Sequence, residues 1–244
     1  MLLENCISFF DFDNTIYKGQ SRYLILDFSV YLEANSAFHS EELQQLFSLF
    51  TTYQENKINR HDFAVQFIQT YYRGLTGREI IEIDEHARNF WNNLPEDSWF
   101  PFTFPLLHLI KDISLPILIS GSPLEVLQRV KRKLGFYKIF ASKGIVNNGE
   151  YTGIVYQEMA TQAAKTRKVN ELTKIHNFNP RSSFAFGDSS SDLPILKAVD
   201  PLNAYLLGAK AALKNEFGDE KWNLLDHDKK IVEHVQNRIN ALKI

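Results

Sequence analysis

Two carboxylates and a threonine follow a short, largely apolar segment near the N-terminus, in a spacing that suits chemistry. The segment Ile7–Phe10 ends on Asp11, and Asp13 and Thr15 follow at alternate positions. Side chains two residues apart on a strand share a face, so the two acids are predicted to project together from the end of a buried strand. Two carboxylates this close repel each other unless a cation or a shared proton holds them. The spacing therefore predicts a catalytic or metal site.

Other acidic loops must be weighed against this interpretation. A calcium-binding EF-hand loop also begins with two alternate acids, but it requires Gly at its sixth position and Glu at its twelfth. Those positions hold Ile16 and Arg22 here, which excludes an EF-hand. An ordinary acidic loop after a strand remains an equal alternative as long as this segment is considered alone. Motifs elsewhere in the chain must therefore distinguish a catalytic or metal site from an ordinary acidic loop.

A second strand is predicted over Leu115–Ile119, and it runs directly into Ser120, Gly121 and Ser122. A helix is expected immediately afterwards, with Ser122 as its N-cap and Glu125 completing a capping box. The free N–H groups and the positive dipole end of such a helix would face the end of the strand, and this arrangement suits a phosphate group. An incidental strand-to-helix turn is the alternative.

A further predicted strand, Ser183–Phe186, also ends in acids, namely Asp188 and Asp192. Before it, Lys165 and Lys168 lie one turn apart in the first turns of a predicted helix. The helix dipole disfavours a cation at this end unless an anion lies nearby. Either lysine fits the helical pattern, so these residues alone leave open which of the two faces the acids.

The joint order of these motifs is more specific than any one of them. Asp11-x-Asp13-x-Thr15, Ser120, Lys165 and Gly187-Asp188-x-x-x-Asp192 follow one another along the chain as in the haloacid dehalogenase-like (HAD) superfamily, which the sequence resembles. The resemblance is greatest to its subfamily IB, the phosphoserine phosphatase-like group, and covers roughly residues 5–20 and 105–207. The stretches that carry it are Ser120–Pro123, Gly149–Gly153 and Gly187–Pro194.

The resemblance implies a role for each catalytic candidate. Asp11 would attack a phosphomonoester and form an aspartyl-phosphate, while Asp13 would protonate the leaving alcohol and then activate water. Ser120 would hold a phosphoryl oxygen, and Lys165 would neutralise charge in the transition state. The family's spacing favours Lys165 over Lys168 for that role.

The resemblance also implies Mg²⁺ as cofactor, because hard oxygen ligands meet at the three strand ends. Asp11, the backbone carbonyl of Asp13 and Asp188 would bind the metal, and Asp192 would support a metal-bound water or hold Lys165. The residues expected to bind substrate are Thr15, Gln20, Gly121 and Ser122.

The fold class implied is α/β, a three-layer Rossmann-like HAD core with a parallel sheet and an inserted α-helical type 1 cap domain. Residues 1–17 and 96–244 are expected to form the core. Residues 18–95 are expected to form the cap, because four segments with helical periodicity lie between the first two strands. A block of four helices is too long for an ordinary crossover between strands.

The composition excludes several classes of protein. The chain has 244 residues, of which 44% are hydrophobic and 23% charged, as in ordinary soluble domains. Its formal net charge of −2 gives no general attraction to nucleic acid or acidic membranes. No signal peptide is recognisable, and no apolar run reaches the roughly 18 residues of a membrane span. The single cysteine, Cys6, excludes an internal disulfide, so a cytoplasmic protein is expected.

The function expected is therefore Mg²⁺-dependent hydrolysis of a small phosphorylated metabolite, with that small molecule as partner and neither nucleic acid nor membrane. A phosphotransferase using the same phosphoaspartate, a phosphoserine phosphatase proper and a non-catalytic phosphate binder are the alternatives. Gln20 stands where the phosphoserine phosphatases carry a Glu that meets the substrate's ammonium group, so L-phosphoserine is expected to be a poor substrate. The oligomeric state is left open.

Overall fold

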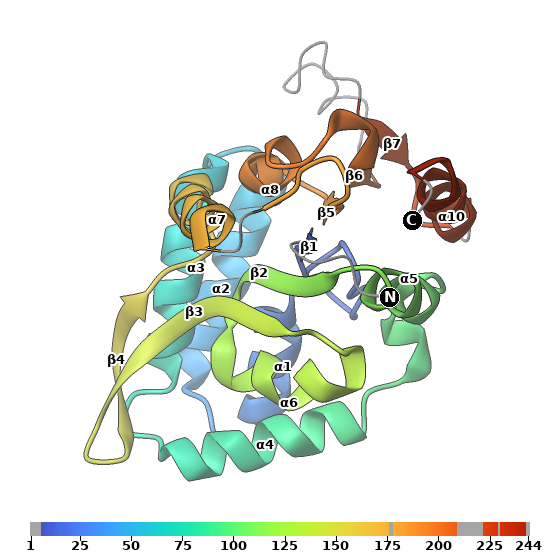
Figure 1. The fold of residues 1–244 in the computed structure, drawn as a ribbon. Helices are drawn as coiled ribbons and strands as arrows, with labels where there is room; N and C mark the ends of the chain where they lie inside the picture. Colours follow the sequence, from blue (N-terminus) through green and yellow to red (C-terminus); the bar gives the residue numbers. More distant parts are fainter. Residues whose placement is uncertain (1–5, 176–177, 209–221, 229, 243–244) are drawn as a thin grey trace.

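The computed structural model describes residues 6–175, 178–208, 222–228 and 230–242. Within them, one sheet of seven strands has the order β4-β3-β2-β1-β5-β6-β7 (Figure 1). The strands are β1 (Ile7–Phe10), β2 (Leu115–Pro123), β3 (Lys138–Asn147), β4 (Glu150–Gln157), β5 (Ala185–Gly187), β6 (Ala204–Leu207) and β7 (Asn223–Leu225). The α-helices are α1 (Leu24–Ala34), α2 (Ser40–Gln54), α3 (Arg60–Gly74), α4 (Ile80–Asn92), α5 (Thr103–Lys111), α6 (Leu124–Leu134), α7 (Gln162–Ile175), α8 (Leu193–Lys197) and α10 (Lys230–Leu242).

The central strand is β1, which pairs in parallel with β2 on one side and with β5 on the other. Phe10, its last residue, is in register with Leu118 of β2 and Phe186 of β5. The carboxyl ends of the three strands therefore lie at one edge of the sheet, and ligand sites of open α/β sheets form at this edge. All neighbouring strands of the sheet are parallel except β3 and β4, which pair antiparallel, and this mostly parallel sheet confirms the predicted α/β fold.

Both faces of the sheet are covered at β1, β5 and β6, which explains why these strands are apolar at nearly every position. One face carries Phe10 and Leu118 and packs against α5, α6 and α10. The opposite face carries Phe9 and Ile117 and packs against α7 and α8. Among the described residues, no helix combines the length and the hydropathy that a membrane span would need.

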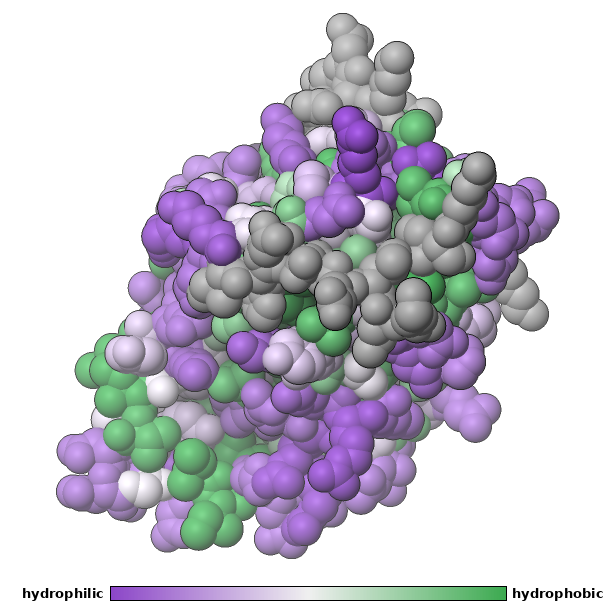
Figure 2. Space-filling model, viewed as in Figure 1, coloured by the Kyte–Doolittle hydropathy of each residue, from purple (hydrophilic) through white to green (hydrophobic). Residues whose placement is uncertain are grey.

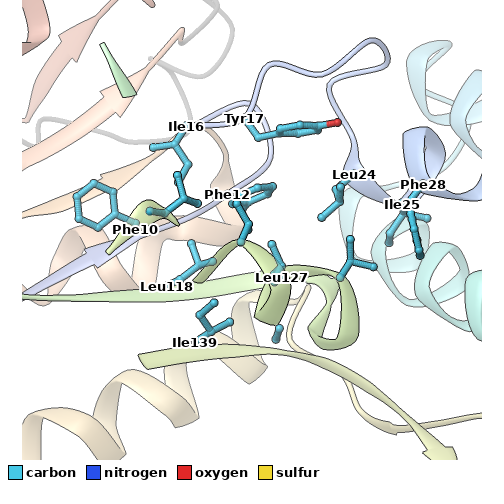
Figure 3. Close-up of a cluster of buried hydrophobic side chains, with 14 of the residues drawn as sticks. Phe10, Phe12, Ile16, Tyr17, Leu24, Ile25, Phe28, Leu118, Leu127 and Ile139 are labelled. Carbon is cyan, nitrogen blue, oxygen red and sulfur yellow. The ribbon is translucent and has the colours of Figure 1, made fainter. Parts of the chain in front are cut away.

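The four helices α1–α4, here called the helical insert, lie between β1 and β2 in the chain and pack onto the same core. Figure 3 shows Phe10 of β1 and Phe12 just after it in one buried cluster with Leu24 and Phe28 of α1. Polar contacts join the insert to the sheet as well, since the Tyr72 hydroxyl donates to the Ser142 carbonyl at 3.0 Å. The division of the chain at residues 17 and 95 into core and cap stays a prediction.

Local details differ from the expectation in two places. Ser122 does not cap α6, because β2 continues to Pro123, which occupies the N-cap position without a side-chain hydrogen bond. Glu125 accepts a hydrogen bond from the Tyr71 hydroxyl and lies 3.1 Å from the Tyr72 hydroxyl, and it does not complete a capping box. In addition, the short strand β7 was not predicted, because its three residues carry no alternating pattern.

The packing of β1 yields a stability prediction. Replacing Phe10, which is fully buried between the rings of Phe136 and Phe186, with Ala should lower the free energy of unfolding by about 3–5 kcal/mol. Ile81→Ala is the matched control, because Ile81 is 74% exposed and its loss should change stability by no more than about 0.5 kcal/mol. Denaturant unfolding measures both values, and equal losses in the two variants would contradict the packing described here.

Candidate active site

Three acidic side chains meet at the carboxyl edge of the sheet. Asp11 directly follows β1, Asp188 directly follows β5, and Asp192 is the last residue of the short 3₁₀ helix Ser190–Asp192. Each offers a carboxylate oxygen, and these oxygens all lie within 4.8 Å of one another. The parallel pairing of β1 with β5 brings the acids together across more than 170 residues of chain.

A buried lysine bridges two of these acids. Lys165 of α7 is 1% exposed, and its Nζ lies 2.6 Å from Asp11 Oδ1 and 2.6 Å from Asp192 Oδ1. Burial alone would lower the pKa of Lys165, but the two carboxylates raise it above its usual range and keep the ammonium charged. Lys168 points elsewhere, since it pairs with Glu171 and lies over the Phe140 ring.

Asp192 is held by backbone as well as by Lys165. Its Oδ2 accepts hydrogen bonds from the backbone N–H groups of Asp188 and Ser189 and from the Ser189 hydroxyl, at 3.0–3.1 Å. Although burial favours the protonated form, Lys165 and these donors hold the pKa of Asp192 below its usual range. Asp192 is therefore a fixed negative charge that orients the lysine.

Asp13 lies beside this cluster but has its own partners. Its Oδ1 accepts the Leu24 N–H at 2.8 Å, one of the free donors at the start of α1, and its Oδ2 accepts the Ser122 hydroxyl at 2.5 Å. Burial, and then the negative charge of Asp11, raises the pKa of Asp13 to about 7. A carboxyl group with this pKa can both give and take a proton near neutral pH.

Asp11 is more acidic than Asp13. Burial and Asp192 raise its pKa, Lys165 opposes them, and the result is about 6. Thr15 adds a longer contact, with its hydroxyl 3.4 Å from Asp11 Oδ2. The ion pair with Lys165 favours the ionised form of Asp11, which a nucleophile requires.

The acid cluster fits a divalent cation that prefers oxygen ligands. Burial, together with the charges of Asp192 and Asp11, raises the pKa of Asp188 well above its usual range, so a nearby cation would be strongly favoured. Asn14 donates from its Nδ2 to Asp188 at 2.8 Å. Its buried Oδ1 has no hydrogen-bond partner among the described residues, so it is free to accept from a metal-bound water. Asp11, Asp188 and Asp192 are the residues that could hold Mg²⁺, and the side chain of Asp13 is committed elsewhere.

The helical insert adds a cation that the sequence analysis missed. Arg60, the first residue of α3, lines the same cavity as Asp11 and Lys165, and its guanidinium donates to the Tyr23 hydroxyl at 3.3 Å. Its buried Nε has no hydrogen-bond partner among the described residues. A cation in the first turn of a helix is disfavoured by the dipole unless an anion lies nearby. The helix-dipole argument that applies to Lys165 and Lys168 would therefore also have drawn attention to Arg60.

The cavity between these groups is small, about 40 Å³, and is closed on the insert side by Phe63, Ala64 and Phe67. It holds a few water molecules at most, since one water occupies about 10–15 Å³ on this measure. Gly121 lines the cavity, where a Cβ atom would lie 2.6 Å from the Cβ of Ala160.

The remaining predicted site residues lie in different surroundings. Ser120 is fully buried near the end of β2, and its Oγ accepts the Ser122 N–H at 3.1 Å. The Ser122 side chain binds Asp13 and so is not free to bind substrate. Gln20 is exposed and borders a separate, largely apolar cavity of about 420 Å³, together with Leu26 and Phe47. The structure therefore does not bring Gln20 to the acid cluster.

Known proteins match this chain in sequence and in fold. The model of the haloacid dehalogenase-like hydrolases matches residues 8–197. The phosphoserine phosphatase SerB1 of Mycobacterium tuberculosis is 24% identical over 221 residues, which cover 90% of this chain and 70% of that protein. A phosphoserine phosphatase of Methanocaldococcus jannaschii is 31% identical over 98 residues, covering 40% of this chain and 46% of that protein.

Solved structures with the same fold cover nearly the whole chain. A protein of unknown function from Bordetella pertussis Tohama I has a TM-score of 0.73 at 18% identity, over 93% of this chain and 100% of that one. A phosphoserine phosphatase captured as a phospho-aspartyl intermediate analogue has a TM-score of 0.64 at 20% identity, over 96% of this chain and 99% of that one. With its family model matched over most of its length, the chain belongs to the haloacid dehalogenase-like hydrolases and is phosphoserine phosphatase-like in sequence and fold.

Proposed function

We propose that this protein is a Mg²⁺-dependent phosphatase that hydrolyses a small phosphomonoester through an aspartyl-phosphate on Asp11. The observation that carries the proposal is the buried cluster in which Lys165 Nζ contacts Asp11 and Asp192 at 2.6 Å while Asp13 lies alongside with a raised pKa. This arrangement supplies an ionised nucleophile, a fixed cation and a separate proton donor. The likeness to phosphoserine phosphatases supports the same reaction class.

In the first step, a carboxylate oxygen of Asp11 attacks phosphorus and the bond from phosphorus to the substrate oxygen breaks. The protonated carboxyl of Asp13 gives its proton to the leaving oxygen, so that a neutral alcohol departs. In the second step, Asp13, now ionised, takes a proton from water as that water attacks the phosphorus. The phosphorus–Asp11 bond breaks, and both residues return to their starting states.

Charge on the phosphoryl oxygens must be balanced during both steps. Lys165 is already charged and fixed by two carboxylates, so it needs no reorganisation as negative charge develops. The Gly121 backbone and the Ser120 hydroxyl, which follow Leu118 at the end of β2, are proposed to hold phosphoryl oxygens. Bound Mg²⁺ would offset the repulsion between the acids and the phosphoryl group.

The substrate class is proposed from Arg60 rather than from Gln20. Arg60 is half-buried and lines the cavity, and its buried Nε, which has no partner among the described residues, suits a second anionic group, such as a carboxylate, on the leaving alcohol. The acids that line the cavity, Asp11 and Asp13, already have catalytic roles, so no described acid there is left for a substrate ammonium group. We therefore propose a small acid-bearing phosphomonoester that is not required to be an amino acid.

The proposal is tested first at the nucleophile. Asp11→Asn is nearly isosteric, so it should abolish phosphatase activity while the circular dichroism spectrum and melting temperature stay close to those of the wild type. Wild-type activity should require Mg²⁺ and disappear in EDTA. Turnover that persists in a clean Asp11→Asn preparation would refute the aspartyl-phosphate mechanism, and the exposed Asp97→Asn variant controls for loss of a negative charge.

The raised pKa of Asp13 predicts a pH dependence. The first step requires the protonated acid, so kcat/KM for an alkyl phosphate should fall as the pH rises through about 7. The value for p-nitrophenyl phosphate should fall less, because its leaving group needs no proton. Asp13→Asn should give a stoichiometric burst of p-nitrophenolate followed by slow turnover, since the second step loses its base. Identical pH profiles for the two substrates would contradict the assignment of Asp13.

Arg60 predicts substrate selectivity. Arg60→Met should lower kcat/KM for phosphoglycolate and L-phosphoserine by about 10–100-fold, because a hydrogen bond to a charged group contributes about 1.5–3 kcal/mol. Phosphoethanolamine, which has no carboxylate, should lose much less. An equal loss for all three substrates would instead assign Arg60 to the transferred phosphoryl group.

A further inference from the structure

Asn14, between Asp13 and Thr15, is fixed at three of its four polar atoms. Its φ of 55° lies in the left-handed region, which Asn tolerates better than most residues. Its N–H donates to the Tyr17 carbonyl at 2.9 Å, and its Nδ2 donates to Asp188 at 2.8 Å. The Asn14 backbone carbonyl is the remaining fixed atom, and its partner comes from the other end of the chain.

That partner is His227, which lies between β7 and α10. Its Nε2 is 2.6 Å from the Asn14 carbonyl oxygen. A carbonyl only accepts hydrogen bonds, so Nε2 carries a proton and donates it. The contact crosses 213 positions of sequence and is shorter than the hydrogen bond from the Asn14 amide to Asp188.

The imidazole ring of His227 is seated tightly. It stacks on Phe100 with the ring centroids 4.0 Å apart and an interplanar angle of 3°. The backbone of Gly208 also packs against the ring, since a Cβ atom at Gly208 would lie 2.0 Å from the His227 Cε1. Gly208 has a φ of 60° and its N–H donates to the Leu225 carbonyl at 2.8 Å, so the backbone that contacts the ring is itself fixed.

From this geometry we infer that His227 is a positioning residue for the metal site. The hydrogen bond from His227 fixes the orientation of the peptide group that follows Asn14. This orientation also determines the direction of the Asn14 side-chain amide, and the amide in turn orients Asp188. The role rests on the proposed function, because Asp188 is a proposed Mg²⁺ ligand. Partners beyond the ligands commonly tune metal affinity by 10–100-fold, so His227 should affect Mg²⁺ binding although it touches no ligand.

Two substitutions separate the hydrogen bond from the packing. His227→Phe keeps a ring that can stack on Phe100 but places a C–H group where the N–H donated, and carbon cannot approach a carbonyl oxygen to 2.6 Å. His227→Gln loses the ring but can place an amide N–H near the position of Nε2. Mg²⁺ affinity is read from calorimetric titration and from the rise in melting temperature with Mg²⁺, and kcat and KM are measured at saturating Mg²⁺.

We expect His227→Phe to bind Mg²⁺ about tenfold more weakly than the wild type, and His227→Gln to stay within about threefold. KM at saturating Mg²⁺ should change little in either variant. If His227→Phe binds Mg²⁺ like the wild type, or if His227→Gln is as weak as His227→Phe, the ring serves packing alone and the inference is overturned. Wild-type protein that neither binds Mg²⁺ nor hydrolyses phosphomonoesters would instead refute the proposed function, and this inference with it.

Discussion

The structure depends on one electrostatic constraint, the burial of Lys165 between Asp11 and Asp192. A buried charge is stable only when it is paired and hydrogen-bonded, and removal of one partner leaves an uncompensated charge. The Lys165 ammonium pairs with two carboxylates, and Asp192 also accepts hydrogen bonds from two backbone N–H groups. Lys165 opposes the effect of burial on the pKa of Asp11 and favours its ionised form. The interaction that stabilises the site therefore also prepares its proposed nucleophile.

Parallel pairing explains why these charges can meet at all. Strand β1 has β2 on one side and β5 on the other, so the loops that follow all three strands open at the same edge of the sheet. Apolar residues cover both faces of these strands, and the first polar side chains appear where the strands end. The position of the polar site therefore follows from where the apolar strands end.

The helical insert completes the site from the opposite side. Its first helix supplies an N–H to Asp13, and α3 supplies Arg60 together with the apolar wall of the cavity. Figure 2 shows that the surface around the insert and the β3–β4 hairpin mixes hydrophilic and hydrophobic side chains, as on ordinary protein surfaces.

The sequence by itself determined the α/β fold and the acids that follow the strands, because period and strand length are local properties of a chain, whereas only the family resemblance favoured Lys165 over Lys168. The hairpin of β3 and β4 turns at Asn148, whose positive φ suits the tight turn. Only the tertiary structure decided the partners: Ser122 binds Asp13 instead of capping a helix, Gln20 lies outside the cavity, and Arg60 enters it. Those contacts join segments that are far apart in the chain, or segments linked by a turn whose direction the sequence does not reveal. No local pattern encodes where such side chains point, because packing of the insert against the sheet fixes their direction.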